Sequence, residues 1–291
     1  VYKEDNFAIN RGDLHQMLMA KIPTEIIHLG KNAIALKQHP QSSLVHFDDG
    51  SQVEADYLLI ADGVHSKLRQ CLVPNSKPRY AGYTCWRAII DNSTINLATG
   101  SETWGAKGRF GMTPLVGNKI YWYACINAAP KSKVFAQYKV ADLLPHFSNY
   151  HQPIPQILAE TKDEQLLWND IVDIVPLKQL AFGNILLIGD AGHATTPNMG
   201  QGACQALEDV AVLIDELKKQ GPVARAFKHV EERRIKRTTY ITKTSKNIGD
   251  IAQWDNPILI SCRNLLMRVL PNKLLQIKLT KLLQEDFMTL K

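Results

Sequence analysis

The 291 residues are 45% hydrophobic and 21% charged, a composition that is typical of a globular protein and excludes a disordered or fibrous chain. The five cysteines are odd in number and form no C-x-x-C pair, so we expect neither a disulfide framework nor a bound metal. No apolar run of about 18 residues occurs, which argues against a membrane span or signal peptide. We therefore predict a cytoplasmic protein.

The formal net charge of +6 is concentrated near the C-terminus, where residues 221–291 carry 14 Lys or Arg against 6 Asp or Glu. Aromatic residues do not alternate with these charges, so we expect no nucleic-acid binding. These charges are either solvated helix faces or a contact with an anionic membrane surface or partner. The segment "NPILISCRNLLMRVLPNKLLQIKLTKLL", residues 256–283, predicts core-capping helices or, as the alternative, peripheral membrane attachment.

The first half of the chain predicts a helix and two sheets. An amphipathic helix begins near Arg11, and short β-type runs over 25–61 predict a meander that ends in the buried strand of "ADYLLIADG". Residues 79–129 are β-type again, rich in aromatic residues and interrupted by Gly and Pro, and predict a second, mainly antiparallel sheet.

The second half predicts helices over 134–160, a strand in "QLLWNDIVDI", and a return to the first sheet in "GNILLIGD". Helices dominate from Gln201 onward, with breaks at Gly221-Pro222, Pro257 and Pro271.

Three motifs carry chemistry. In "ILLIGDAGHATTPNMGQGA", Asp190 ends an apolar strand, where it can accept hydrogen bonds from sugar-like hydroxyls, and Gly200 and Gly202 leave open the positive start of a helix. In "ADYLLIADGVHSKLRQ", a strand leads through Asp62-Gly63 to Arg69 on the opening turn of a helix. In "INRGDLHQML", Arg11 stands at the front of a helix.

Together and in this order, these motifs resemble the FAD-dependent aromatic-ring monooxygenases that are similar to para-hydroxybenzoate hydroxylase, in the branch of urate hydroxylase and zeaxanthin epoxidase. The helix arginine, the D-G-x-x-S-x-x-R segment and the G-D-A-x-H-x-x-x-P-x-x-G-Q-G segment match that family over about residues 7–270. The family's first motif, a G-x-G-x-x-G turn, occurs nowhere in the chain. We therefore expect a part of a longer enzyme that alone binds FAD poorly and is inactive.

The resemblance implies an α/β fold with an FAD/NAD(P)-binding domain like that of glutathione reductase, truncated at its N-terminus. That domain would carry an inserted, mainly antiparallel substrate domain and C-terminal helices. The expected boundaries are 1–78 for the first part of the FAD-binding domain, 79–180 for the substrate domain, 181–220 for the return to the FAD-binding domain, and 221–291 for the C-terminal helices.

The resemblance also implies a set of FAD-contacting residues: Arg11, Ala33, Asp62, Gly63, Arg69, Gly189, Asp190, Pro197, Gly200, Gln201, Gly202 and Ala203. Asp190 would bond the ribityl chain, Pro197 would lie over the isoalloxazine, and the helix start would face the flavin pyrimidine edge. The segment with Asp62 serves both FAD and NAD(P)H in the family, although Asp62 could equally tie its own loop together.

On the substrate side, Arg109 and Tyr121 match in spacing the pocket residues of urate hydroxylases, and Arg109 has a structural ion pair as its alternative role. His193 is either a base or, as we prefer, a residue that fixes its loop. The implied reaction uses NAD(P)H and molecular oxygen to hydroxylate an aromatic or heteroaromatic molecule through a flavin hydroperoxide. The alternatives are an epoxidase or hydroxylase of isoprenoids, carotenoids or quinone precursors, and an inactive binding protein.

Overall fold

The computed structural model of the protein describes residues 8–269 and 286–288, and the chain divides into two compact units. The α/β unit comprises His28–Ala81 and Val172–Gly249 with the described part of Glu285–Lys291. The sheet unit comprises Gly82–Ile171 with the described parts of Val1–Ile27 and Asp250–Gln284. Each unit combines segments that are far apart in the sequence.

A small parallel pair of strands lies at the centre of the α/β unit. Strand β4 (Leu58–Ile60) runs parallel to β11 (Ile185–Leu187), and β10 (Ala181–Phe182) pairs with β11 in the antiparallel sense. The register joins Ile60 to Leu187. Both strands come from the continuous apolar runs that predict buried strands, and Ile185–Leu187 is buried throughout.

The meander of the α/β unit forms a separate antiparallel sheet in the order β1-β2-β3, as the sequence pattern predicts. Its strands are β1 (Ala33–Gln38), β2 (Ser43–Phe47) and β3 (Gln52–Ala55). The turn Asp48-Asp49-Gly50 joins the last two strands.

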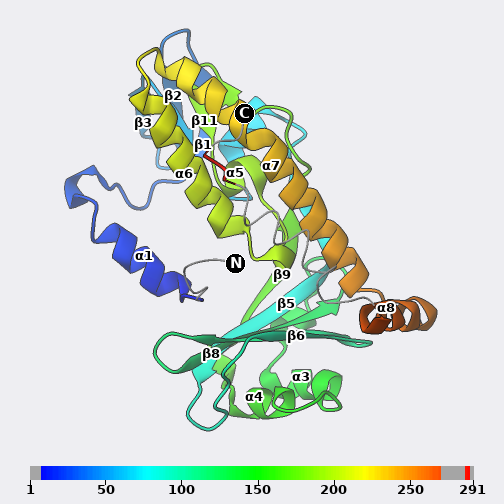
Figure 1. Ribbon diagram of the computed structural model, residues 1–291. Coiled ribbons are helices and arrows are strands. Elements are labelled where there is room, and N and C mark those ends of the chain that lie inside the picture. The colour runs from blue at the N-terminus through cyan, green and yellow to red at the C-terminus, as the bar shows by residue number, and fades with distance from the viewer. Residues whose placement is uncertain (1–7, 270–285, 289–291) are drawn as a thin grey trace. The chain divides into compact units, whose positions relative to one another are not determined.

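Helices α6 (Gly202–Lys218) and α7 (Val223–Ala252) pack beside one another in this unit (Figure 1). The shorter helices are α2 (Lys67–Leu72), α5 (Asp190–His193) and η4 (Pro197–Met199). The strands and helices share one apolar core, formed by residues such as Ile60, Ile185, Leu187, Val212 and Phe227.

A five-stranded sheet in the order β6-β7-β8-β5-β9 forms the sheet unit. Its strands are β5 (Arg79–Asp91), β6 (Ser101–Gly105), β7 (Gly108–Leu115), β8 (Lys119–Asn127) and β9 (Leu167–Asp173). Strands β6, β7, β8 and β5 pair in the antiparallel sense.

One face of this sheet is covered by two helices, α3 (Val140–Phe147) and α4 (Ile154–Glu160), as Figure 1 shows. Because side chains alternate across a strand, Trp122, Phe110 and Trp86 all point to this covered face, where they are completely buried. The remaining helices of the unit are α1 (Arg11–Met19), η1 (Thr24–Ile26), η2 (Phe135–Gln137), η3 (Asp163–Gln165) and α8 (Pro257–Val269).

The fold class is confirmed: a mixed α/β structure carries a mainly antiparallel sheet and ends in helices. The functional domain boundaries stay a prediction. Among the described residues, no helix is both long enough and apolar enough to cross a membrane. The predicted break at Pro271 lies outside the described residues.

Candidate functional site

The carboxyl ends of β4 and β11 bring two of the sequence motifs together. Because these strands are parallel neighbours with Ile60 opposite Leu187, the segments that follow them leave the sheet at the same edge. Asp62 and Asp190, which lie two and three residues beyond the ends of these strands, are both exposed there. An open edge with two carboxylates is suited to a ligand with several hydroxyl groups.

Arg69 fastens the two segments to one another. Its guanidinium donates to the carbonyl oxygens of Val64 (2.7 Å), Gly63 (3.4 Å) and, in the other segment, Ala191 (3.2 Å). The residue is completely buried, and this burial lowers its pKa. Ser66 caps α2 by accepting a hydrogen bond from the Arg69 amide at 2.8 Å. Arg69 therefore has its hydrogen-bonding groups turned toward the protein.

Gly189 allows the turn that exposes Asp190. Its backbone has φ 56° and ψ −144°, a conformation that favours glycine, and an added Cβ would lie 3.4 Å from the Cβ of Ala206. The Gly189 amide donates to the Asp209 carboxylate at 2.8 Å, and His193 Nε2 lies 2.6 Å from the same oxygen. His193 is thus buried and bound to an acid, which agrees with a role in fixing the loop.

The loop that follows leads to an open helix start. Gly200 adopts a left-handed conformation with φ 64°, and Gln201 at the N-cap of α6 makes no side-chain capping bond. Pro197, Gly200 and Ala203 are exposed. The first N–H groups of this 17-residue helix, together with its dipole, favour a negatively charged group.

The structure divides the predicted site residues between the two units. The residues predicted to contact FAD all belong to the α/β unit, with the exception of Arg11. Ala33 lies there on β1, opposite Phe47 and next to an irregularity in the register. Arg11 begins α1, is exposed, and belongs to the sheet unit together with Arg109 and Tyr121.

Arg109 and Tyr121 lie on the face of the five-stranded sheet opposite to the buried aromatic core. Arg109 pairs with Cys125 in the register, and Tyr121 lies four residues earlier on β8, so their Cα atoms are roughly 13 Å apart along the strand direction. Both side chains therefore contribute to one polar face but to different parts of it.

The Arg109 guanidinium is buried in a polar cluster. It donates to Gln253 Oε1 at 2.8 Å, forms an ion pair with Glu102 at 3.2 Å and lies 5.0 Å from the ring centre of Tyr83. Only 2% of the residue is exposed. The ion pair that was the alternative role of Arg109 is present, and the role in substrate binding stays a prediction.

Burial raises the pKa of the Tyr121 phenol to about 12, so the phenol is protonated at neutral pH and well above it. The positive charge of Arg87, whose guanidinium donates to Asn169 at 2.7 Å, opposes part of this increase. Burial also raises the pKa of neighbouring Tyr123, and Gly111 leaves the space in which the Tyr123 ring lies. A neutral phenol can donate a hydrogen bond to a ligand but does not act as a base at neutral pH.

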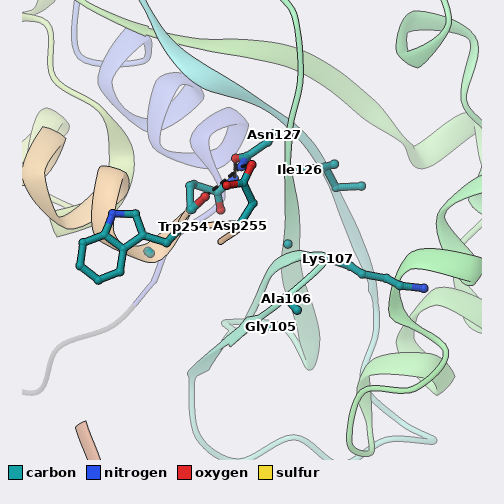
Figure 2. Close-up of a pocket in the computed structure, with 10 residues that line it drawn as sticks. Gly105, Ala106, Lys107, Ile126, Asn127, Trp254 and Asp255 are labelled. Carbon is teal, nitrogen blue, oxygen red and sulfur yellow. Dashed lines mark hydrogen bonds between the residues drawn. The ribbon is translucent and has the colours of Figure 1, made fainter. Parts of the chain in front are cut away.

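Two cavities are lined by none of the residues predicted to bind FAD or substrate, although Gln253, which accepts from Arg109, lines the smaller one. Figure 2 shows one of about 90 Å³ between the hairpin Gly105–Gly108 and the segment Ala252–Asp255 of the sheet unit. This volume is below the roughly 300–1,000 Å³ of typical ligand pockets. A cavity of about 350 Å³ in the α/β unit is lined by residues such as Leu72, Pro176 and Phe182 and by none of the predicted site residues.

Sequence reasoning missed several polar residues beside the predicted ones. Glu102, Arg87 and Tyr123 lie on the same sheet face, and strict alternation along "YTCWRAII" and "IYWYAC" could have separated this face from the aromatic core. Asp209 was missed as well. Its signal is an acid on the buried side of α6, at helical spacing from Val212 and Leu213.

A family model described as "FAD binding domain" matches residues 27–221. This range includes the edge with Asp62 and Asp190 and the open start of α6, so site and family model agree on an FAD-binding fold. The chain belongs to the family of FAD-dependent aromatic-ring monooxygenases.

Two relatives are a monooxygenase/isomerase and a quinolone synthase. The chain is 36% identical over 263 residues to aurachin C monooxygenase/isomerase of Stigmatella aurantiaca. This match covers 90% of this chain and 68% of the relative. The chain is 28% identical over 270 residues to 2-heptyl-3-hydroxy-4(1H)-quinolone synthase of Pseudomonas aeruginosa. This match covers 91% of this chain and 70% of the relative.

Among solved structures, HpxO of Klebsiella pneumoniae in complex with FAD and uric acid superposes with a TM-score of 0.84 at 25% identity. The match covers 94% of this chain and 71% of HpxO. The chain is also 29% identical over 231 residues to FAD-dependent urate hydroxylase of Klebsiella oxytoca, a match that covers 78% of this chain and 60% of that relative. The predicted likeness to urate hydroxylases is therefore confirmed.

Proposed function

We propose that this chain contributes the flavin site and the substrate face of a monooxygenase that uses NAD(P)H and molecular oxygen to hydroxylate an aromatic or heteroaromatic small molecule. The observation that carries the proposal is the shared edge of β4 and β11, where exposed Asp190 stands beside the open start of α6. This edge occurs within a chain whose family binds FAD.

The residues present fit a flavin. Asp190 offers a carboxylate to the ribityl hydroxyls, and the N–H groups at Gly202 and Ala203 offer donors to the pyrimidine edge, where reduced flavin is negatively charged. Pro197 is exposed next to them and would restrict the space above the ring. Arg69 would act indirectly, since its buried guanidinium holds the two loops together.

The flavin, when bound, would supply the redox chemistry with NAD(P)H and oxygen. The protein's part is to bind, orient and exclude water. On the polar face of the sheet unit, we assign Tyr121 as a hydrogen-bond donor to the substrate and Arg109 as the cation that orients a polar ring. Glu102 and Gln253 hold the Arg109 guanidinium and so set its direction.

The substrate class that we favour is a bicyclic heteroaromatic ring. One relative is a 2-heptyl-3-hydroxy-4(1H)-quinolone synthase, and HpxO is in complex with uric acid in its crystal structure. Such rings present both a hydrogen-bond acceptor for a phenol and a polar edge for a guanidinium, which matches the two groups on the sheet.

A second candidate is an epoxidase or hydroxylase of isoprenoid or quinone-type substrates. It is favoured by 33% identity over 213 residues to zeaxanthin epoxidase of an Oncidium hybrid cultivar, although the chain covers only 32% of that protein. The exposed apolar residues of α8, such as Ile258, Leu265 and Val269, would suit a contact with lipid. The rest of that predicted membrane segment, from residue 270, lies outside the described residues.

The test is NAD(P)H consumption by the full-length protein across phenols, purines, quinolones and isoprenoid quinones, with hydrogen peroxide measured in parallel. We expect a quinolone or purine to stimulate consumption with little peroxide. Stimulation by isoprenoids alone would favour the second candidate. A full-length protein that holds no flavin would refute the proposal and leave an inactive binding protein.

A further inference from the structure

Helix α7 is linked to both ends of the loop that follows β11, to one end directly and to the other through α6. The contact at the first end passes through Asp209 of α6, whose carboxylate accepts from the Gly189 amide at 2.8 Å and lies 2.6 Å from His193 Nε2. These two bonds hold the left-handed turn that exposes Asp190.

Arg234 of α7 holds that carboxylate in place. Its Nε donates to the second Asp209 oxygen at 2.8 Å, and its remaining nitrogens bond Glu208 and, at 2.6 Å, the side chain of Gln205. Arg234 is only 1% exposed and Asp209 only 2%. Burial alone would raise the pKa of Asp209, but His193 and Arg234 together bring it below its usual value. The acid therefore stays ionised and keeps accepting the Gly189 bond.

Ser245 of α7 holds the other end of the loop. Its hydroxyl donates to the Thr196 carbonyl at 2.6 Å and lies 2.8 Å from the Thr196 hydroxyl. Asn198 adds a bond to the Ser245 carbonyl at 2.8 Å. Pro197, which we place over the flavin ring, lies between these two anchored residues.

The two anchors share one face of α7. Eleven residues separate Arg234 from Ser245, which is about three helical turns and roughly 16 Å of helix. One continuous helix therefore acts on the loop at two points, directly through Ser245 and indirectly through the bond from Arg234 to Asp209 of α6. A single rigid element of this length opposes movement of the turn at Gly189 and of the segment around Pro197 together.

We propose that Arg234 and Ser245 of α7 are positioning residues that pre-shape the flavin loop Gly189–Asn198. This inference rests on the proposed function. Both residues lie outside residues 27–221, the part matched by the FAD-binding model. The helix whose charges the sequence pattern assigns to a solvated face thus acts on the cofactor site through the loop.

The test compares Arg234→Gln and Ser245→Ala with two matched controls in the full-length protein. Arg233→Gln removes ion pairs from α7 to Asp215 and Glu216 of the same neighbouring helix, far along α6 from the loop. Thr238→Ala removes a buried hydroxyl that donates to the α7 carbonyl of Arg234. Each control changes the same type of side chain on the same helix, at a position whose hydrogen bonds go to Asp215 and Glu216 or to α7 itself and not to the loop Gly189–Asn198.

Two quantities are measured: the FAD dissociation constant of the apoprotein by flavin fluorescence, and hydrogen exchange of residues 188–200 without flavin. We expect FAD binding to weaken at least tenfold in Arg234→Gln and several-fold in Ser245→Ala, with faster exchange in both. The controls should stay within about twofold of the wild type. Ser245→Thr, which keeps the hydroxyl, should restore most of the affinity.

Affinity and exchange that match those of the controls would overturn the inference. Absence of FAD binding by the wild type would instead overturn the proposed function. Faster exchange in Arg234→Gln and Ser245→Ala would in that case show that α7 holds the loop for another purpose, so the two failures are distinguishable.

Discussion

The covered face of the five-stranded sheet and the loop after β11 are held by different forces. On the sheet, Phe110 stacks on Trp122 with ring centres 5.2 Å apart, and neither side chain is exposed. At the loop, Asp209 and Arg234 are buried as an ion pair whose atoms also bond the backbone.

This difference separates stability from ligand binding. Apolar packing has no preferred direction and lowers the free energy of the folded state in proportion to the area buried. Buried ion pairs add little net stability because desolvation offsets their attraction, but they have defined directions and so fix geometry. Substitutions in the first region should therefore change mainly the unfolding free energy. Those in the second should also change ligand affinity, in addition to the stability lost when a buried charge loses its partner.

The largest effect is expected from Phe110→Ala. The substitution removes a completely buried ring from the aromatic core and should cost about 3–5 kcal/mol of unfolding free energy. Urea denaturation measures this value, and Thr113→Ala on the opposite face of β7 is the control. A loss below about 1 kcal/mol would contradict the division between packing and binding.

Asp190→Ala should act on the flavin and leave stability unchanged, since the side chain is exposed. Loss of a charged acceptor is expected to weaken FAD binding by roughly tenfold to a hundredfold. The flavin content of the purified full-length protein reports this, with Glu54→Ala as an exposed acidic control in the same unit. Full flavin retention would remove Asp190 from the site.

Arg109→Gln should raise the KM for the aromatic substrate about tenfold or more while flavin content stays the same. The substitution removes the cation that Glu102 and Gln253 hold on the polar face of the sheet, and charge-assisted hydrogen bonds are stronger than neutral ones. Steady-state kinetics checks this, and Lys107→Gln on the adjacent hairpin is the control. An unchanged KM with lower stability would leave Arg109 with the structural ion pair as its sole role.

Tyr121→Phe should have the smallest effect, a rise in KM of roughly twofold to tenfold, which is typical of one neutral hydrogen bond. Because the phenol titrates at about 12, it is protonated throughout pH 6–9 in the wild type. The pH–rate profiles of the two proteins should therefore have the same shape. A limb that disappears in the variant would show that Tyr121 acts as an acid or base.

Much of the site could be predicted from the sequence because its parts are local. The open start of α6 and the cap at Ser66 depend on residues within one turn of each other, and the glycine that permits the turn before Asp190 is part of the same motif spacing. The parallel pairing of β4 and β11 also follows, since both strands are continuously apolar and each ends in a Gly-Asp or Asp-Gly turn.

The partners of the charged residues depended on the tertiary structure. Arg69 reaches a carbonyl 122 residues away, and Arg234 reaches an acid 25 residues away. No local pattern encodes such pairs, because a charged side chain on a helix has the same sequence signal whether it meets water or a buried acid. The sequence by itself determined the family, the elements and the flavin loop. Only the fold decided that α7 holds this loop and that Arg109 is buried beside Glu102, because long-range packing selects which charges are removed from water.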